Sequence, residues 1–169
     1  GVVVSWDPRA AYARVLPAEE VATFLERVDF AGWNRLNDGG RSFEEAEQEL
    51  IARFPDDREA ILGYRVHFDA ALTGMVPGTS GLLAELGQAG VRLIALTTWS
   101  AETFPVAIER FGILRRFEAI VVSGTEGLLK PEPALYQLAL DRHGLSADST
   151  VFIDDIPANV AAAARLGMA

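Results

Sequence analysis

Polar side chains that could do chemistry stand at three places where a short apolar run of the sequence ends in a turn. At the first, the run Leu93–Leu96 is followed by Thr97, Thr98, Trp99 and Ser100. The Thr97 hydroxyl could bind an anion, and the backbone amides of the turn point as those of a helix N-terminus do. Ser100 as an ordinary helix N-cap, with Thr97 as a plain strand end, would account for the same residues.

The second place holds the only lysine of the chain. Fourteen of the fifteen basic residues are arginine, and Lys130 is the exception. It follows a loop with two glycines and precedes Pro131, which favours an extended backbone at the lysine. A compact ammonium suits a site where a planar guanidinium does not fit equally well. We therefore expect Lys130 to neutralise an anionic ligand, the alternative being a solvated lysine before a helix.

The third place carries two adjacent carboxylates, Asp154 and Asp155, directly after the apolar run Val151–Ile153. Charge at the end of a buried strand is costly unless it is compensated. A divalent cation that prefers oxygen ligands, above all Mg²⁺, would compensate it. Asp155 as the N-cap of the following helix would explain one carboxylate but not both. The pair therefore predicts a magnesium site.

These three places fall at the ends of strands in the pattern that runs from Thr79 onward. We expect helices over 80–89, 101–111, 133–143 and 158–166, and strands over 91–97, 119–123 and 150–154. Strands that alternate with helices indicate right-handed crossovers and an α/β fold with a doubly wound parallel sheet. Ligands of such sheets bind beyond the carboxyl ends of the strands, where the three places lie.

The first part of the chain has helical periodicity almost throughout. Asp7 and Pro8 predict an N-cap followed by proline at the first helical position, and Ser42 with Glu45 predicts a capping box. We expect helices over 8–15, 17–28, 30–36 and 43–54, and a long one from residue 56 or 57 to about 72. A bundle of about 65 residues is too small for a convincing independent enzyme. We interpret residues 8–72 as a helical cap on a core of residues 1–7 and 73–169.

The composition excludes several classes of protein. Half of the 169 residues are apolar, which is enough to bury a sizeable core, and the net charge of −9 disfavours nucleic acid as a partner. The chain has no cysteine, so it has no disulfide, thiolate metal site or cysteine nucleophile, which fits a cytoplasmic protein. No apolar stretch approaches the roughly 20 residues that span a bilayer, so we expect no membrane partner.

A hydroxyl, a cation and a carboxylate pair at successive strand ends resemble motifs II, III and IV of the haloacid dehalogenase-like hydrolase superfamily. The runs that carry the resemblance are Ala95–Pro105, Ser123–Pro133 and Phe152–Asp155. They are similar to subfamily IA, which includes sugar-phosphate phosphatases and the phosphatase domain of bifunctional epoxide hydrolases. The resemblance covers essentially the whole chain and implies a Rossmann-like core with a C1-type cap. Where relatives often carry Ser-Asn, Thr97 and Thr98 keep the hydroxyl.

The chain departs from this family at motif I, whose aspartate nucleophile lies on the first strand. The run Gly1–Pro8 looks like the segment that follows that motif, so the resemblance puts the nucleophile three residues before Gly1, outside the sequence. We expect that the sequence was trimmed at both ends. The central strand would then precede Gly1, and a further strand would follow Ala169.

The resemblance implies a Mg²⁺-dependent hydrolase of small phosphate monoesters that works through an aspartyl-phosphate intermediate. Asp155 would ligate Mg²⁺. Asp154 would either orient the ligands without contacting the metal or share the coordination. Thr97 and Lys130 would hold phosphoryl oxygens, and the cap would exclude water and read the leaving group of a small phosphorylated metabolite. Substrate contacts are expected beside motif II and in the cap, where packing or turn roles stay open: Thr98, Trp99, Trp6, Trp33, Asn37, Asp38 and Arg41.

Other functions remain open. A 2-haloacid dehalogenase of the same fold needs no metal, and its motif IV is typically not an aspartate pair, so Asp154 and Asp155 favour a phosphatase. A non-catalytic binding module of this fold would follow if the nucleophile is truly absent. A serine hydrolase is disfavoured, because His67 and His143 lie in helical stretches and no Gly-x-Ser-x-Gly sequence occurs.

Overall fold

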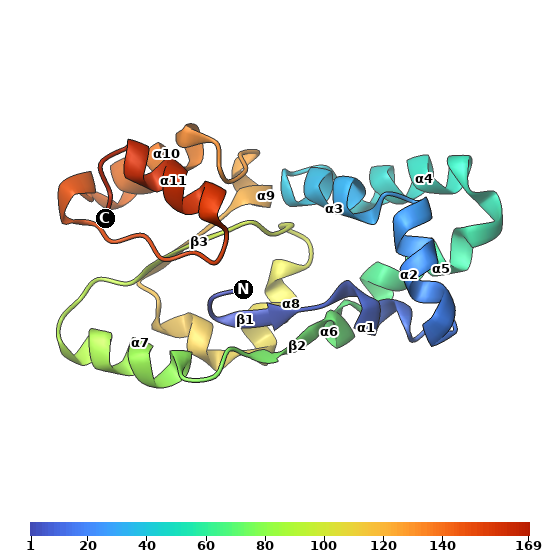
Figure 1. Cartoon of the computed structure of the whole chain (residues 1–169), viewed down its shortest axis with the longest axis horizontal. Helices are drawn as coiled ribbons and strands as arrows, with labels where there is room; N and C mark the ends of the chain where they lie inside the picture. The colour runs from blue at the N-terminus through green and yellow to red at the C-terminus, as the bar shows by residue number, and fades with distance from the viewer.

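Helices dominate the computed structural model, which describes all of residues 1–169 (Figure 1). The first part of the chain contains β1 (Val4–Trp6), α1 (Pro8–Tyr12), α2 (Ala18–Arg27), α3 (Phe30–Asp38), α4 (Phe43–Arg53), the 3₁₀ helix η1 (Pro55–Asp57), α5 (Arg58–Val66), α6 (Phe68–Ala71) and β2 (Leu72–Met75). The second part contains α7 (Thr79–Gln88), β3 (Ile94–Thr97), α8 (Phe104–Arg110), η2 (Gly112–Arg116), β4 (Ala119–Val122), α9 (Ser123–Glu126), α10 (Pro133–His143), η3 (Ala147–Ser149) and α11 (Pro157–Arg165). None of the helices combines the length and the apolar character that crossing a membrane requires.

A two-stranded antiparallel ribbon joins the two parts of the molecule. In this ribbon β1 pairs with β2, and Val4 lies opposite Met75. The helices α1 to α6 leave the ribbon through β1 and return through β2, and we call them the α1–α6 bundle. The bundle forms one end of the elongated molecule (Figure 1). The ribbon was not among the expected strands, because its three- and four-residue strands carry little periodicity.

The helix starts of the bundle follow the predicted caps. The Asp7 carboxylate accepts a hydrogen bond from the Arg9 amide, with Pro8 at the first helical position. The Ser42 hydroxyl accepts from the Glu45 amide at 3.3 Å and itself donates to the Glu45 carboxylate at 2.9 Å. Both caps are confirmed, although Glu45 contacts the serine hydroxyl and not the backbone N–H expected in a capping box.

The long helix expected up to residue 72 is wrong in its extent. It ends at Val66, and after His67 the short helix α6 leads into β2. Leu72 pairs with Trp6 in the ribbon, so strand pairing overrides the local helical pattern. The predicted cap Asp57 makes no capping hydrogen bond, because its carboxylate binds both terminal nitrogens of Arg27, at 2.6 and 2.9 Å.

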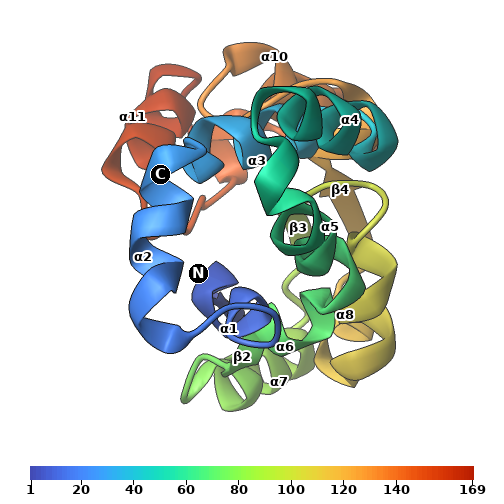
Figure 2. The same ribbon diagram turned by 90° about the vertical axis from the view of Figure 1, so that its right-hand side faces the viewer.

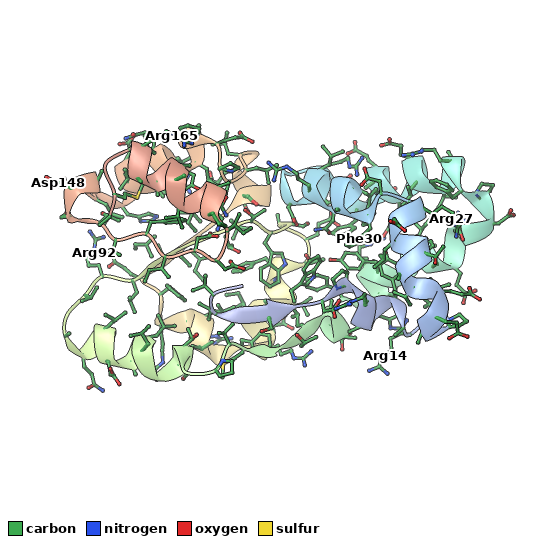
Figure 3. The ribbon with its side chains drawn as sticks, in the orientation of Figure 1. Arg14, Arg27, Phe30, Arg92, Asp148 and Arg165 are labelled. Carbon is green, nitrogen blue, oxygen red and sulfur yellow. The ribbon has the colours of Figure 1, made fainter.

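Aromatic side chains fill the interior of the bundle. Tyr64 stacks on Tyr12 with ring centroids 5.6 Å apart and meets Phe30 edge-on at 5.0 Å. Figure 3 shows Phe30 inside the bundle and Arg14 at its edge. The same cluster of buried side chains continues into α7 and α8 through Leu83 and Ala107. The bundle therefore shares its apolar core with the elements next to the ribbon.

The other strand pair confirms the predicted α/β class. Strand β3 pairs with β4 in parallel, and the register runs from Ile94 opposite Ala119 to Thr97 opposite Val122. Helices α10 and α11 lie on one side of β3, and α7 and α8 lie on the other, in both views (Figures 1 and 2). The carboxyl ends of the two strands thus meet at one edge, which is the expected place for a ligand.

The third parallel strand expected over 150–154 is not formed. The segment is extended, but its backbone pairs only with the last residue: the Phe152 amide donates to the Ala169 carbonyl, and the Ala169 amide donates to the Thr150 carbonyl. Val151 is 69% exposed and Ile153 is 62% exposed. The apolar run predicts the extended backbone correctly, but a strand also needs a neighbouring strand, and none pairs with this segment.

Candidate active site

A buried ion pair joins the loop before α10 to the loop before α11. The Lys130 ammonium lies 2.6 Å from Asp154 Oδ2, and the two side chains are only 11% and 4% exposed. Lys130 also lies over the ring of Phe152, 5.7 Å from its centre. The only lysine of the chain thus meets the acidic pair at Asp154, and the alternative of a solvated lysine is wrong.

The second oxygen of Asp154 is also engaged. Its Oδ1 accepts hydrogen bonds from Asn159 Nδ2 and from the Ile156 amide, each at 2.9 Å. Burial alone would raise the pKa of Asp154, but the bonds from Lys130, Asn159 and Ile156 together hold it below its ordinary value. Asp154 is therefore ionised at neutral pH with both oxygens occupied. It positions the lysine and the start of α11.

Asp155 has a different environment from its neighbour. Its side chain is 51% exposed, and its Oδ2 lies 2.6 Å from the Gly1 ammonium. The Asp155 carboxylate is thus accessible from outside the protein. Asp155 does not cap α11, whose N-cap is Ile156 without a side-chain hydrogen bond. Any residue that precedes Gly1 in a longer chain would lie beside Asp155.

The donor atoms at this place fit Mg²⁺ held through a single protein carboxylate. The chain contains no cluster of three or more His, Cys, Asp or Glu side chains that could form a complete metal cage. Magnesium commonly keeps several waters and binds through one or two carboxylates together with substrate phosphate. Asp155 could supply one such ligand. Asp154 would keep its hydrogen-bond partners and orient the site without contacting the metal.

The turn after β3 is held by other residues of the chain. Thr97 and Thr98 are half-buried where the strand ends. The next amide, that of Trp99, donates to the Ser123 hydroxyl at 2.8 Å. The same hydroxyl donates to the backbone carbonyl of Asp38, which comes from the end of α3, at 2.6 Å. The Trp99 amide of this turn is thus already bound by a side chain of the same protein.

Ser123 was missed by sequence reasoning, although it stands directly after the buried strand β4. Its side chain is fully buried, and its hydroxyl donates to the Asp38 carbonyl at 2.6 Å while it accepts from Trp99. A serine followed by glycine after an apolar strand is the signal that could have identified it. Ser123 therefore links three segments: the turn after β3, the start of α9 and the end of α3.

We expect Ser123→Ala to lower the free energy of unfolding by about 2 kcal/mol, because it leaves a buried amide and a buried carbonyl without their partner. Urea denaturation would measure the change. Ser80→Ala, at an exposed position in α7, serves as the control and should change stability little. A Ser123 variant as stable as the control would show that water or another group satisfies both backbone atoms.

Two of the predicted substrate contacts have structural partners. Trp99 packs edge-on against Phe68 and Phe104, and its indole N–H donates to Thr103 at 3.1 Å. Arg41 donates to Asn37, Glu49 and the Trp33 carbonyl at 2.9 to 3.1 Å. These bonds tie α3 to the start of α4. Both side chains are therefore committed to packing within the protein.

The other predicted contacts, in β1 and in the bundle, differ in exposure. Trp6 is 42% exposed and stacks on Phe30 with ring centroids 6.2 Å apart, so one part of its ring stays accessible. Trp33 is buried and donates to the Ala46 carbonyl at 3.0 Å. Asn37 is completely buried, and its Nδ2 has no hydrogen-bond partner. A further cation was not predicted: Arg35 of α3 donates to the Lys130 carbonyl at 3.4 and 3.5 Å.

Curated proteins with similar sequences include hydrolases of two kinds. Acyl-CoA dehydrogenase family member 10 of Mus musculus is 30% identical over 99% of this chain and 16% of its own length. Haloacetate dehalogenase H-2 of Moraxella is 31% identical over 54% of this chain and 41% of its own. Phosphoglycolate phosphatase of Vibrio cholerae is 29% identical over 57% and 42%. The chain thus spans less than half the length of these relatives.

Solved structures share the fold. A haloacid dehalogenase family enzyme of Bacteroides thetaiotaomicron, in complex with magnesium and inorganic phosphate, superposes with a TM-score of 0.77 at 17% identity, over 99% of this chain and 86% of its own. L-2-haloacid dehalogenase of Xanthobacter autotrophicus gives a TM-score of 0.66 at 16% identity, over 97% and 71%. The sequence model of the haloacid dehalogenase-like hydrolases matches residues 2–167. This chain therefore belongs to the haloacid dehalogenase-like hydrolase family.

Proposed function

We propose that the chain is the main part of a Mg²⁺-dependent hydrolase of small phosphate monoesters. One observation carries the proposal: the buried Lys130–Asp154 pair lies next to the accessible carboxylate of Asp155. A fixed ammonium and an accessible carboxylate can together receive an anion and the cation that accompanies it. A phosphoryl group with Mg²⁺ has this combination of charges.

Each residue of the site has a separate task in this proposal. Asp154 holds the Lys130 ammonium in place, so that its remaining donors face a phosphoryl oxygen. The Thr97 hydroxyl at the end of β3 binds another oxygen. Asp155 holds Mg²⁺, which when bound supplies positive charge to the phosphoryl group and so stabilises charge that develops in the transition state.

The attacking group in this proposal is an aspartate three residues before Gly1 in a longer form of the chain. It would form an aspartyl phosphate that water then hydrolyses. Two features of the structure support placing this aspartate beside Asp155. The Gly1 nitrogen lies 2.6 Å from Asp155, so residues before it would lie next to this carboxylate. The extended segment 150–154 also has exposed apolar side chains that a preceding strand could cover.

The α1–α6 bundle is proposed as the cap, with residues 8–72 as its bounds. It contacts both loops of the site: the Asp38 carbonyl accepts from Ser123, whose hydroxyl also binds the turn after β3, and Arg35 donates to the Lys130 carbonyl. A bundle placed there can exclude water from the reaction and contact the leaving group of a small phosphorylated metabolite.

A 2-haloacid dehalogenase is the second candidate, favoured by the likeness to haloacetate dehalogenase H-2. The accessible Asp155 argues for the phosphatase, because a carboxylate beside the reaction would repel an anionic haloacid unless a cation neutralised it. The likeness to phosphoglycolate phosphatase points the same way. Dependence on a metal separates the two candidates.

We expect the full-length protein to hydrolyse para-nitrophenyl phosphate in Mg²⁺ and to lose this activity in EDTA. Asp155→Asn should abolish the activity, because the amide removes the charged ligand but keeps the shape. Magnetic resonance of the Asp155 amide during titration with Mg²⁺ gives a readout that does not depend on turnover. Asp56→Asn, an exposed position in η1, is the control and should behave as wild type.

An Asp155→Asn variant with unchanged metal dependence would refute the role of this residue. Release of chloride from 2-chloropropionate without metal would make the dehalogenase the better assignment. Absence of both activities, in a folded full-length protein, would favour a binding module.

A further inference from the structure

We propose that a pocket between α2, α3 and α4 binds a small organic carboxylate. The apolar body of the ligand lies on the floor of the pocket, and its carboxylate binds Arg35 and Arg53. The pocket has a volume of about 390 Å³, and its lining includes neither Lys130 nor the aspartate pair. Sites for small molecules range from about 300 to about 1,000 Å³, so the ligand must be small. All of the lining residues belong to the α1–α6 bundle, so binding there is independent of the proposed function.

The pocket lies in the angle between two helices that are joined almost without a loop. Helix α2 ends at Arg27 and α3 begins at Phe30, so only Val28 and Asp29 connect them. Asp29 makes this sharp turn with a φ of 48°, and it is the only non-glycine residue of the chain with a positive φ. Such a backbone conformation costs free energy, and it occurs often where a protein holds a ligand. Helix α4 supplies the opposite wall, and the three helices lie together at the bundle end of the molecule (Figure 1).

Apolar side chains form the floor of the pocket. Val28, Trp33 and Leu50 line it, and each of them is at most 6% exposed. Leu36 also lines the pocket but is 55% exposed, so it marks the rim. An aromatic or branched aliphatic group in the pocket would remove this apolar surface from water, which favours binding. The pocket therefore fits a ligand with an apolar body.

The charged residues of the pocket leave one positive charge in excess. Three arginines, Arg35, Arg41 and Arg53, line it together with two carboxylates, Asp29 and Glu49. Arg41 and Glu49 neutralise each other in an ion pair of 2.9 Å. The local excess contrasts with the net charge of −9 of the whole chain. One positive charge suits a carboxylate better than a phosphate monoester, which carries a charge of about −1.5 to −2.

Two of the three arginines are available to an anion. Neither Arg35 nor Arg53 forms an ion pair within the chain. Arg53 lies over the ring of Phe54, 5.3 Å from its centre. Arg35 donates to the Lys130 carbonyl at 3.4 and 3.5 Å, which is long for a hydrogen bond. A guanidinium group matches the two oxygens of a carboxylate, so an anion in the pocket offers both arginines a stronger partner.

The test titrates the isotope-labelled full-length protein with phenylacetate, which joins an aromatic ring to one carboxylate. The amide resonances of Gly32, Leu36 and Arg53 should shift together and saturate on one binding curve. Phenylacetamide has the same shape without the charge, and acetate has the charge without the ring. Each should bind about tenfold more weakly or less, because each makes only one part of the interaction. Phenyl phosphate that binds these residues more tightly than phenylacetate would overturn the choice of a carboxylate.

Variants of the two arginines test the binding of the carboxylate. Arg53→Gln and Arg35→Gln should each weaken phenylacetate binding about fivefold or more, because each removes a charged donor. Arg14→Gln is the matched control, because Arg14 is an exposed arginine at the edge of the bundle and does not line the pocket (Figure 3). It removes the same charge and should leave the affinity unchanged. Equal affinities in Arg14→Gln and Arg53→Gln would overturn the proposal.

The contact between Arg35 and Lys130 gives a second readout. If Arg35 turns to the anion, it leaves the Lys130 carbonyl, so the carbonyl-carbon resonance of Lys130 should move during the titration. The same resonance should stay fixed when phenylacetate is added to Arg35→Gln. A Lys130 resonance that does not move in the wild type would remove Arg35 from the binding site.

Leu36→Glu tests the pocket without changing an arginine. It puts a negative charge at the rim and should abolish the binding of phenylacetate, because like charges repel. Leu82→Glu in α7 is the matched control, because Leu82 is 50% exposed and lies outside the pocket. Both positions are exposed, so both variants should fold. Shifts at Gly32 and Arg53 that persist in Leu36→Glu, or no saturable shift there in the wild type, would overturn the proposal.

Discussion

Replacing Lys130 by alanine should lower kcat/KM for phosphate ester hydrolysis by about a hundredfold or more, and the free energy of unfolding by about 3 kcal/mol. The first effect follows from the loss of a fixed positive charge beside the phosphoryl group. The second follows from the burial of Asp154, which is only 4% exposed and would keep its charge without a counterion. Steady-state kinetics and urea denaturation would measure the two effects.

Two other variants make this expectation specific. Lys130→Arg should also be impaired, because an ammonium 2.6 Å from Asp154 and close to the Phe152 ring leaves little room for a guanidinium. Arg92→Ala breaks an ion pair with Glu118 of the same 2.6 Å length, but both of its side chains are about half exposed. This control should change stability little, because solvent screens the pair. A fully active Lys130→Arg enzyme would contradict the proposed role of the lysine.

Gly124→Ala should lower the free energy of unfolding by about 3 kcal/mol, at the upper end for an overpacked site. The added Cβ would lie 2.5 Å from the Ala101 nitrogen and 2.8 Å from the Trp99 carbonyl oxygen. Both are backbone atoms of the turn after β3 and cannot rotate away. The chain must therefore move the turn away from α9 or lose stability.

The control for this change is Gly87→Ala in α7, where no atom lies within 4 Å of the new Cβ. Alanine should stabilise that helix by about 0.5 to 1 kcal/mol, since glycine has the lower helix propensity. Urea denaturation of both variants gives opposite changes if the packing is as described. Equal urea midpoints for Gly124→Ala and Gly87→Ala would show that the turn after β3 can shift without a loss of stability.

Local chemistry predicts the parts of the fold that depend on neighbours in sequence. The caps at Asp7 and Ser42 and the parallel strands β3 and β4 follow from residue types and spacing alone. The helix end at Val66 could not be predicted, because it depends on Leu72 pairing with a strand more than sixty residues earlier. The expected strand over 150–154 fails for the converse reason: its pattern is correct, but no partner strand lies beside it.

The candidate site shows the same limit. The proximity of Lys130 to the acidic pair could be expected because both follow apolar segments that are predicted as strands of one sheet. The different environments of Asp154 and Asp155 could not be expected from the sequence. Asn159 and the Ile156 amide donate to Asp154 Oδ1, an oxygen that a metal would otherwise use. Asp38 could be named as a residue of interest, but its contact with Ser123 depends on how α3 packs against the strand ends.

The extended segment Val151–Ile153 has a consequence for the behaviour of the protein in concentrated solution. An extended backbone with exposed apolar side chains offers donors and acceptors to any other peptide that can add as a strand. Molecules of residues 1–169 could therefore associate edge to edge through this segment, whereas a strand that precedes Gly1 in the proposed longer form would cover it. The net charge of −9 opposes that association by mutual repulsion, and salt weakens the repulsion. The chain is thus best kept at low ionic strength.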